Sequence, residues 1–148
     1  MSRFLCVAPP YAGHVFPLAS IGAELALRGH DVALVSYAAA RRFLPAGCEL
    51  FAVADDAVLQ RSEELGRNPP PRFLAAQVAL FYRDLVVPMA DAWLTPLDEI
   101  VQRFRPDAIL ADQHALAGGL VARRRGLPWV TSSASSMVHG HALEQHAP

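Results

Sequence analysis

The apolar positions of this chain gather into short runs that alternate with longer segments of helical spacing. The run that starts at Phe4 is followed by four more of strand length, at residues 31–36, 49–53, 106–112 and 127–131. Helical spacing is predicted between them, at residues 17–28, 38–44, 73–87, 89–104 and 115–125. Strands that alternate with helices over short turns predict an α/β fold: a doubly wound, mostly parallel, Rossmann-like sheet with helices on both faces.

Prolines and glycines predict where these elements begin and end. Pro9 and Pro10 end the first strand, because proline cannot donate to a ladder. Pro17 is expected at the first position of the first helix, and Pro88 is expected to separate two helices. This interpretation leaves Gly13 and His14 in a tight turn between a strand and a helix.

Residues 54–72 are polar and rich in proline, and residues 132–148 are small and polar, so both segments are predicted to be loops. Large apolar side chains crowd the two helical stretches between 73 and 104. Most are expected to pack on the sheet, which leaves the surplus aromatic groups near the loop ends to line an apolar ligand pocket.

Composition narrows the class of protein. A chain of 148 residues, 53% hydrophobic and 18% charged, is expected to form one globular domain over residues 1–148. Its net charge of -1 gives no argument for nucleic acid or a membrane surface. No signal peptide is evident and no apolar stretch reaches about 18 residues, so cytoplasmic residence is the expectation. Cys6 and Cys48 are expected to be buried thiols.

The candidate chemistry lies at the ends of two strands. In a sheet of order 3-2-1-4-5, the strand order reverses between strands one and four, and ligands bind in the crevice there. His14 follows strand one and Asp112 ends strand four. An imidazole oriented by a carboxylate can accept a proton near pH 7, which suits the activation of a substrate hydroxyl. Structural roles remain open: His14 could bond the turn, and Asp112 could cap the helix near Ala115.

Other polar residues give weaker signals. Asp107 and His30 are expected to be structural. His139, His141 and His146 lack a firm third ligand, so no metal site is predicted. The first turn has a single glycine and two prolines, which does not match a dinucleotide fingerprint.

The segment Gly13-His-Val-Phe-Pro17, the run to Gly29-His-Asp-Val32, and Pro106-Asp-Ala-Ile-Leu-Ala-Asp112 with Gly126-Leu-Pro128 resemble the N-terminal domain of the family-1, GT-B glycosyltransferases. The bacterial natural-product and macrolide enzymes are the nearest in character. The resemblance implies inverting transfer of a sugar from a nucleotide-activated donor, a dTDP- or UDP-sugar, to a hydroxyl of an apolar acceptor, without a metal. It also implies that His14 is the general base and that Asp112 is its partner.

The resemblance further implies an acceptor site in the 54–90 region and after strand five, and a donor site nearby. The expected acceptor-binding residues are Tyr11, Phe16, Phe73, Phe81, Tyr82, Met89 and Met137, and the expected donor-binding residues are Gly13, Ser132 and Ser133. Family members grip the nucleotide with a C-terminal domain that nothing in this chain matches, so the chain alone is expected to have little activity. Two alternatives are a non-catalytic module that binds a small molecule or docks on a partner, and another GT-B-type enzyme such as a sugar-nucleotide epimerase.

Overall fold

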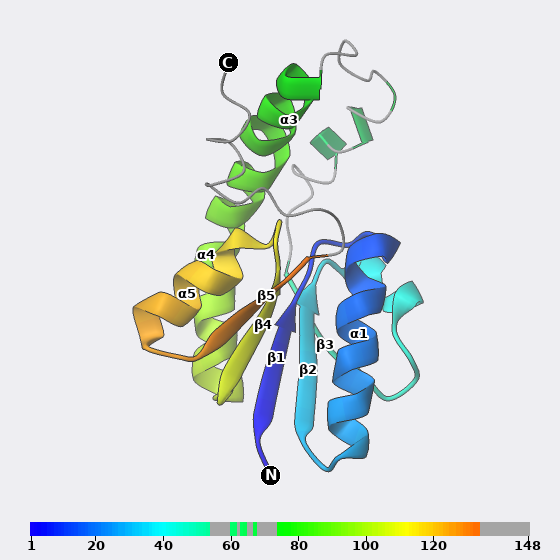
Figure 1. Ribbon diagram of the computed structural model, residues 1–148, viewed down its shortest axis with the longest axis vertical. Helices are drawn as coiled ribbons and strands as arrows, with labels where there is room; N and C mark the ends of the chain where they lie inside the picture. Colours follow the sequence, from blue (N-terminus) through cyan, green and yellow to red (C-terminus); the bar gives the residue numbers. More distant parts are fainter. Residues whose placement is uncertain (54–59, 62, 65–66, 68–73, 134–148) are drawn as a thin grey trace, which may run out of the picture.

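The computed structural model describes residues 1–53, 60–61, 63–64, 67 and 74–133 (Figure 1). Side chains are described from residue 78 onward in the second half. Phe73, Met137, most of the predicted 54–72 loop and the histidines at 139, 141 and 146 lie outside the described residues.

The chain forms a five-stranded sheet in which each pair of neighbouring strands is parallel. The strand order is β3-β2-β1-β4-β5, the order that the pairing of His14 with Asp112 had assumed. At the centre, Val7 of β1 is paired with Val35 of β2 on one side and with Ala111 of β4 on the other. The strands are β1 (Arg3–Val7), β2 (Asp31–Ser36), β3 (Glu49–Ala52), β4 (Ala108–Asp112) and β5 (Trp129–Ser132).

Helices cover both faces of the sheet, with α1 on one side and α4 and α5 on the other (Figure 1). The described helical elements are α1 (Ala12–Leu27), the 3-10 helix η1 (Ala38–Phe43), α3 (Leu74–Phe81), the π-helical turn η2 (Tyr82–Val86), α4 (Val87–Phe104) and α5 (Leu116–Arg125). The stretch at 38–44 is therefore helical as expected, although its turns are of the 3-10 type. Among the described residues, no helix has both the length and the apolar character needed to cross a bilayer.

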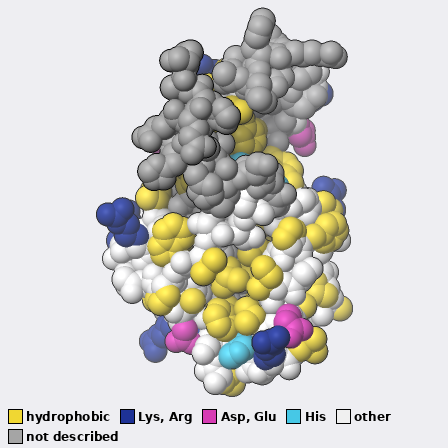
Figure 2. Space-filling model, in the orientation of Figure 1, with side chains coloured by type: hydrophobic (Ala, Val, Ile, Leu, Met, Phe, Trp, Pro, Cys, Tyr) yellow, Lys and Arg dark blue, Asp and Glu magenta, His cyan; other side chains and the backbone are white. Residues whose placement is uncertain are grey.

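Alternation along the strands divides the buried side chains into two cores. Leu5 and Val7 of β1 point into the core beneath α4 and α5, whereas Cys6 points into the core beneath α1. Successive strand residues face opposite sides of a sheet. Because helices cover both sides here, the central strands are continuous apolar runs without alternation. At the edge of the sheet, Trp129 and Val130 of β5 are exposed. The face seen in Figure 2 carries scattered hydrophobic side chains, with charged ones nearer its margins.

The prediction that Pro17 opens the first helix is wrong. Helix α1 begins at Ala12, and Pro17 lies inside it. The first turn is closed by the backbone N–H groups of His14 and Val15, which both donate to the Tyr11 carbonyl at 2.9 Å. Pro17 costs the helix a single backbone bond, and the turn ahead of it is anchored independently. His14 therefore lies on a helix rather than in a loop.

The prediction that Pro88 separates two helices is also wrong. The backbone passes from α3 through η2 into α4, and Pro88 lies within the first turn of α4. Proline has no N–H to donate four residues back, and the preceding turn widens instead: the Val87 N–H donates to the Tyr82 carbonyl, five residues back. A single π turn accommodates the proline without ending the helix.

Cys48 differs from its predicted environment as well. Cys6 is buried, but Cys48 is only partly buried, because it lies in the turn that leads into β3 and donates its backbone N–H to the Pro45 carbonyl at 3.3 Å. The two residues expected to be structural are so. The Asp107 carboxylate accepts from the Arg3 N–H at 2.8 Å, and His30 Nδ1 accepts from the Ser2 N–H at 3.2 Å.

Close contact between α5 and the sheet yields a stability prediction. A Cβ at Gly118 would lie 2.7 Å from the Ala111 Cβ and 3.5 Å from the Val7 Cβ. Overpacking costs about 1–3 kcal/mol and the gain in helix propensity is at most about 1 kcal/mol, so Gly118→Ala is expected to lower the free energy of unfolding by about 1–2 kcal/mol in urea titrations. Gly13→Ala is the control, because among the described residues its Cβ would meet no atom within 4 Å. An equal loss in both variants would contradict this account.

Candidate active site

His14 and Asp112 lie in direct contact although 98 positions separate them in the sequence. His14 projects from the first turn of α1, and Asp112 is the last residue of β4. Because β1 and β4 are neighbours, both side chains reach the carboxyl edge of the sheet at the point where the strand order reverses. His14 Nδ1 lies 2.9 Å from Asp112 Oδ2. The topology therefore brings together the two residues that sequence analysis had paired.

The Asp112 carboxylate is almost fully buried and holds a second polar group. Its residue is 2% exposed, and its Oδ1 accepts from the His114 backbone N–H at 2.9 Å. This bond stabilises the turn that precedes α5. The helix itself begins at Leu116 after Ala115, without a side-chain cap, so the alternative of Asp112 as a helix cap is not what the structure contains. His14, likewise, uses its ring nitrogen on Asp112 and not on the turn.

This arrangement selects the tautomer of His14. An ionised carboxylate has no proton to donate, so the proton in the 2.9 Å contact belongs to Nδ1 of the imidazole. In the neutral ring, Nε2 then carries the lone pair. The His14 side chain is 20% exposed, so it remains reachable from the cavity that it lines. A neutral imidazole in this form can accept a proton at Nε2, while the carboxylate stabilises the resulting imidazolium.

A second histidine, His114, belongs to the site and was not anticipated. Its ring centre lies 5.0 Å from that of His14 and 5.0 Å from that of Phe81, with edge-to-face geometry in both pairs. Its Nδ1 is buried without a hydrogen-bond partner among the described residues and lies 3.9 Å from Asp112 Oδ1. Burial lowers the pKa of His114, and the Asp112 carboxylate opposes that shift in part. The available signal was a cluster of polar residues directly after a buried strand, Asp112-Gln-His114.

The two histidines line one small, mostly apolar cavity. Its volume is about 20 Å³, which is roughly the space of one water molecule. Of the predicted acceptor-binding residues, three line it: Tyr11, Phe81 and Met89. Pro9, Tyr37, Leu85 and Val86 complete the wall, and sequence analysis did not single them out.

Of the other four predicted acceptor residues, two have described positions outside the cavity lining. Tyr82 lies at the border of the cavity, where its ring centre is 6.0 Å from that of His114. Phe16 is 52% exposed and packs on Phe43 with ring centres 5.5 Å apart, so it does not join the cavity. His14 and Phe16 are two positions apart on α1, which corresponds to a rotation of roughly 200° about the helix axis. Phe16 therefore points away from the side that His14 occupies. Phe73 and Met137 lie outside the described residues.

The predicted donor-binding residues lie beside the pair. Gly13 directly precedes His14 in the first turn of α1. Ser132 is the register partner of Asp112 across β4 and β5, and its carbonyl accepts from the Gln113 N–H at 2.9 Å. The Ser133 hydroxyl donates to Gln113 Oε1 at 3.0 Å. The three residues therefore lie near the carboxyl edge of the sheet, close in sequence or in register to His14 and Asp112.

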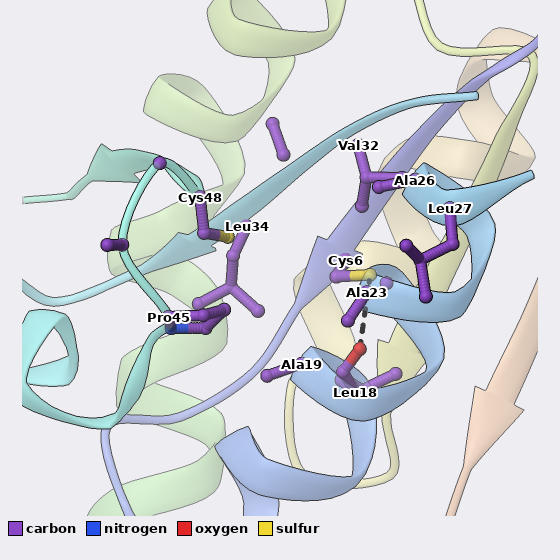
Figure 3. Close-up of a pocket in the computed structure, with 14 residues that line it drawn as sticks. Cys6, Leu18, Ala19, Ala23, Ala26, Leu27, Val32, Leu34, Pro45 and Cys48 are labelled. Carbon is purple, nitrogen blue, oxygen red and sulfur yellow. Dashed lines mark hydrogen bonds between the residues drawn. The ribbon is translucent and has the colours of Figure 1, made fainter. Parts of the chain in front are cut away.

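A larger cavity lies elsewhere among the described residues, and its lining includes no histidine or carboxylate. It has a volume of about 490 Å³ and lies between α1 and the turn at 45–48, lined by small and apolar side chains such as Ala19 and Ala23 (Figure 3). Its two thiols are those of Cys6 and Cys48. Burial raises the pKa of Cys6 to about 12, so this group stays protonated and is a poor nucleophile.

His14, Asp112 and His114 also form a group with the spacing of possible metal ligands. One ligand atom from each lies within 4.8 Å of the others, which holds for no other trio among the described residues. His14 Nδ1, however, directs its proton at Asp112 Oδ2, and a nitrogen that donates a hydrogen bond cannot ligate an ion at the same time. The observed arrangement is a direct hydrogen bond between His14 and Asp112.

The pKa of His114 gives a pH-dependent stability. Its folded-state pKa lies below the ordinary value of 6.5, so below pH 6.5 the unfolded chain binds the proton more readily. The stability present above that pH is therefore lost as the pH falls towards the folded-state pKa. His114→Gln is expected to flatten the decline in unfolding free energy between about pH 7 and about pH 5, as measured by urea titration. The facing groups His14 and Asp112 are the same in both proteins. Equal declines of the unfolding free energy with pH in the unchanged protein and in His114→Gln would contradict a role of His114.

Comparisons with known proteins relate the sequence and fold of this chain to sugar-transferring enzymes. No protein-family model matches the chain. The elloramycin glycosyltransferase ElmGT of Streptomyces olivaceus is 32% identical over 134 residues, which are 86% of this chain and 35% of that enzyme. The zeaxanthin glucosyltransferase of Pseudescherichia vulneris is 30% identical over 138 residues, 88% of this chain and 30% of that enzyme.

A solved structure gives the same answer for the fold. SsfS6, a glycosyltransferase of Streptomyces sp. SF2575, superposes with a TM-score of 0.68 at 28% identity, over 90% of this chain and 39% of SsfS6. The same enzyme in complex with thymidine diphosphate gives a TM-score of 0.64. The chain thus spans about a third of the length of its curated relatives. In sequence and in fold it is similar to that third of the bacterial natural-product glycosyltransferases, which confirms the resemblance to GT-B enzymes drawn from its motifs.

Proposed function

We propose that this chain is the acceptor-binding, base-bearing domain of an inverting glycosyltransferase, with His14 as general base and Asp112 as the residue that orients it. The observation that carries the proposal is the 2.9 Å contact between His14 Nδ1 and a buried carboxylate at the switch point of the sheet. A pair of this kind is unnecessary for packing, since burying a charged group costs free energy unless it is compensated. Its natural use is proton abstraction at Nε2.

The contact between His14 and Asp112 supports the following reaction. His14 Nε2 accepts the proton of an acceptor hydroxyl as the oxygen attacks the anomeric carbon of the donor sugar. A new bond forms between the oxygen and that carbon, and the bond from the carbon to the phosphate oxygen breaks. The nucleoside diphosphate leaves from the opposite side, so the anomeric configuration inverts. Asp112 stabilises the imidazolium while the proton resides on it, which lowers the barrier by general base catalysis.

The donor is proposed to be a nucleotide-activated sugar, dTDP- or UDP-linked, held mainly by the part of such enzymes beyond the third that this chain spans. The similarity to SsfS6, a protein solved with thymidine diphosphate, supports this choice of co-substrate. Pro9 and Pro10 supply no backbone N–H groups to cradle a pyrophosphate, which is consistent with a division of labour between two domains. No metal ion is assigned a role in the proposed transfer.

The acceptor is proposed to be a small molecule with an apolar body. The cavity beside His14 is walled by Tyr11, Phe81 and Met89, whereas its polar groups are concentrated at the two histidines. Its volume of about 20 Å³ admits a hydroxyl-bearing edge and leaves the rest of the acceptor outside. This combination of an apolar wall and a few convergent polar groups is typical of small-molecule sites.

The test joins this chain to the remaining two thirds of ElmGT and measures transfer from dTDP-sugars to phenolic and macrolide acceptors. The unjoined chain is expected to give little or no turnover. In the joined protein, His14→Ala is expected to lower kcat by about 100-fold or more. Asp112→Asn is expected to lower it by about 100- to 10,000-fold, because an amide can favour the wrong tautomer of His14.

His30→Gln is the control for loss of a histidine. His30 is packed against Phe4, with ring centres 5.2 Å apart, and its substitution should leave transfer unchanged. Full activity of His14→Ala in the joined protein would remove the base assignment. Robust turnover by the unjoined chain would instead overturn the assignment of donor binding to a missing domain. Binding of acceptors without any transfer in the joined protein would favour a non-catalytic binding module.

A further inference from the structure

Two imidazoles share one carboxylate at this site. Asp112 Oδ2 holds Nδ1 of His14 at 2.9 Å, and Asp112 Oδ1 lies 3.9 Å from Nδ1 of His114. The proposed transfer needs a single base, and His14 fills that role. His114 is therefore a polar group in the cavity wall that the reaction itself does not use.

The carboxylate also biases the tautomer of His114. The separation of 3.9 Å is too long for a hydrogen bond, yet a negative charge at that distance favours the form in which Nδ1 carries the proton. Among the described residues Nδ1 has no partner and is buried, so Nε2 is the nitrogen that a ligand can reach. Because burial lowers the pKa of His114, the ring is neutral near pH 7 and Nε2 holds a lone pair.

Both rings therefore present hydrogen-bond acceptors to the same space. They line one cavity, and their centres are 5.0 Å apart. Phe81 packs against the far side of the His114 ring, also at 5.0 Å, which holds the imidazole next to His14. A ligand edge in this cavity meets two acceptors side by side, and each is best satisfied by a hydroxyl that donates.

We propose that His114 is an acceptor-binding residue that accepts a hydrogen bond from a second hydroxyl of the sugar acceptor, adjacent to the hydroxyl that His14 deprotonates. The acceptor class is then a compound with an apolar body and hydroxyls on neighbouring carbons. This inference rests on the proposed function for the role of His14. The two imidazoles lie edge to face with their centres 5.0 Å apart, a spacing that suits two adjacent hydroxyls at the mouth of the cavity.

Selectivity among acceptors is expected to arise from the free-energy cost of leaving His114 Nε2 without a hydrogen bond. An acceptor that lacks the second hydroxyl, or carries it as a methyl ether, leaves Nε2 of His114 desolvated without a donor. The lost hydrogen bond and the unsatisfied nitrogen are together expected to give about a tenfold preference for the diol, which corresponds to about 1.4 kcal/mol.

The experiment compares three matched ligands: 2,3-dihydroxynaphthalene, 3-methoxy-2-naphthol and 2-naphthol. Binding to this chain is measured by isothermal titration calorimetry, and transfer is measured in the protein joined to the rest of ElmGT. The unchanged chain is expected to bind the diol about tenfold more tightly than either monohydroxy ligand. This comparison needs no substitution, so it does not depend on a variant that folds.

Two variants then assign the preference to His114. His114→Phe keeps a ring against Phe81 and His14 but removes the lone pair, so all three ligands should bind equally. His114→Gln places an amide oxygen near the position of Nε2 and should retain part of the preference. His30→Gln is the matched control and should bind as the unchanged chain does. Circular dichroism verifies that each variant is folded.

The outcomes separate this inference from the proposed function. Equal binding of the three ligands by the unchanged chain, or a diol preference that survives His114→Phe, overturns the inference. If the inference about His114 is overturned but transfer to 2-naphthol still proceeds and depends on His14, the proposed function stands on its own. A diol preference that is erased by His114→Phe supports the inference even where no transfer occurs. Failure of all three ligands to bind and to react counts against both.

Discussion

The hydrogen bond between His14 and Asp112 depends on one feature of the sheet, the adjacency of β1 and β4. His14 belongs to the first turn after β1, and Asp112 ends β4, so only the pairing of Val7 with Ala111 brings the two side chains to a common edge. Had β4 been added at the outer side of β3, the same residues would lie at opposite ends of the sheet. The reversal of strand order is thus a requirement of the chemistry as well as a description of the fold.

Helix α5 packs closely on the same two strands. Gly118 faces Ala111 and Val7, and the 2.7 Å spacing to the Ala111 Cβ leaves no room for a methyl group. Small residues at the crossing of helix and strand let α5 start directly beyond Asp112. The turn at His114 is consequently short, and its backbone N–H can reach Asp112 Oδ1. Packing in the core and the position of the second histidine are therefore linked.

Much of this arrangement could be predicted from the sequence, and the failures have definite causes. The strands and their order follow from apolar runs and chirality rules, because burial on both faces leaves a clear pattern. Pro17 and Pro88 were misinterpreted, because the rules for proline are local while the surrounding helix tolerates one lost bond. The error at Pro17 also misplaced Phe16, whose direction depends on where α1 begins. His114 was missed because its proximity to His14 arises from a turn and not from periodicity.

Asp112 shows how stability and chemistry compete at one residue. A carboxylate that is 2% exposed must be compensated, and the described structure compensates it with the His14 ring and the His114 backbone N–H. If stability alone governed this position, an apolar side chain of similar size would serve as well or better. The buried charge has a different effect: it keeps the proton of His14 on Nδ1 and biases His114 in the same direction. One negative charge thus sets the hydrogen-bonding character of both rings, and the cavity they line becomes a surface that accepts protons and hydroxyl donors.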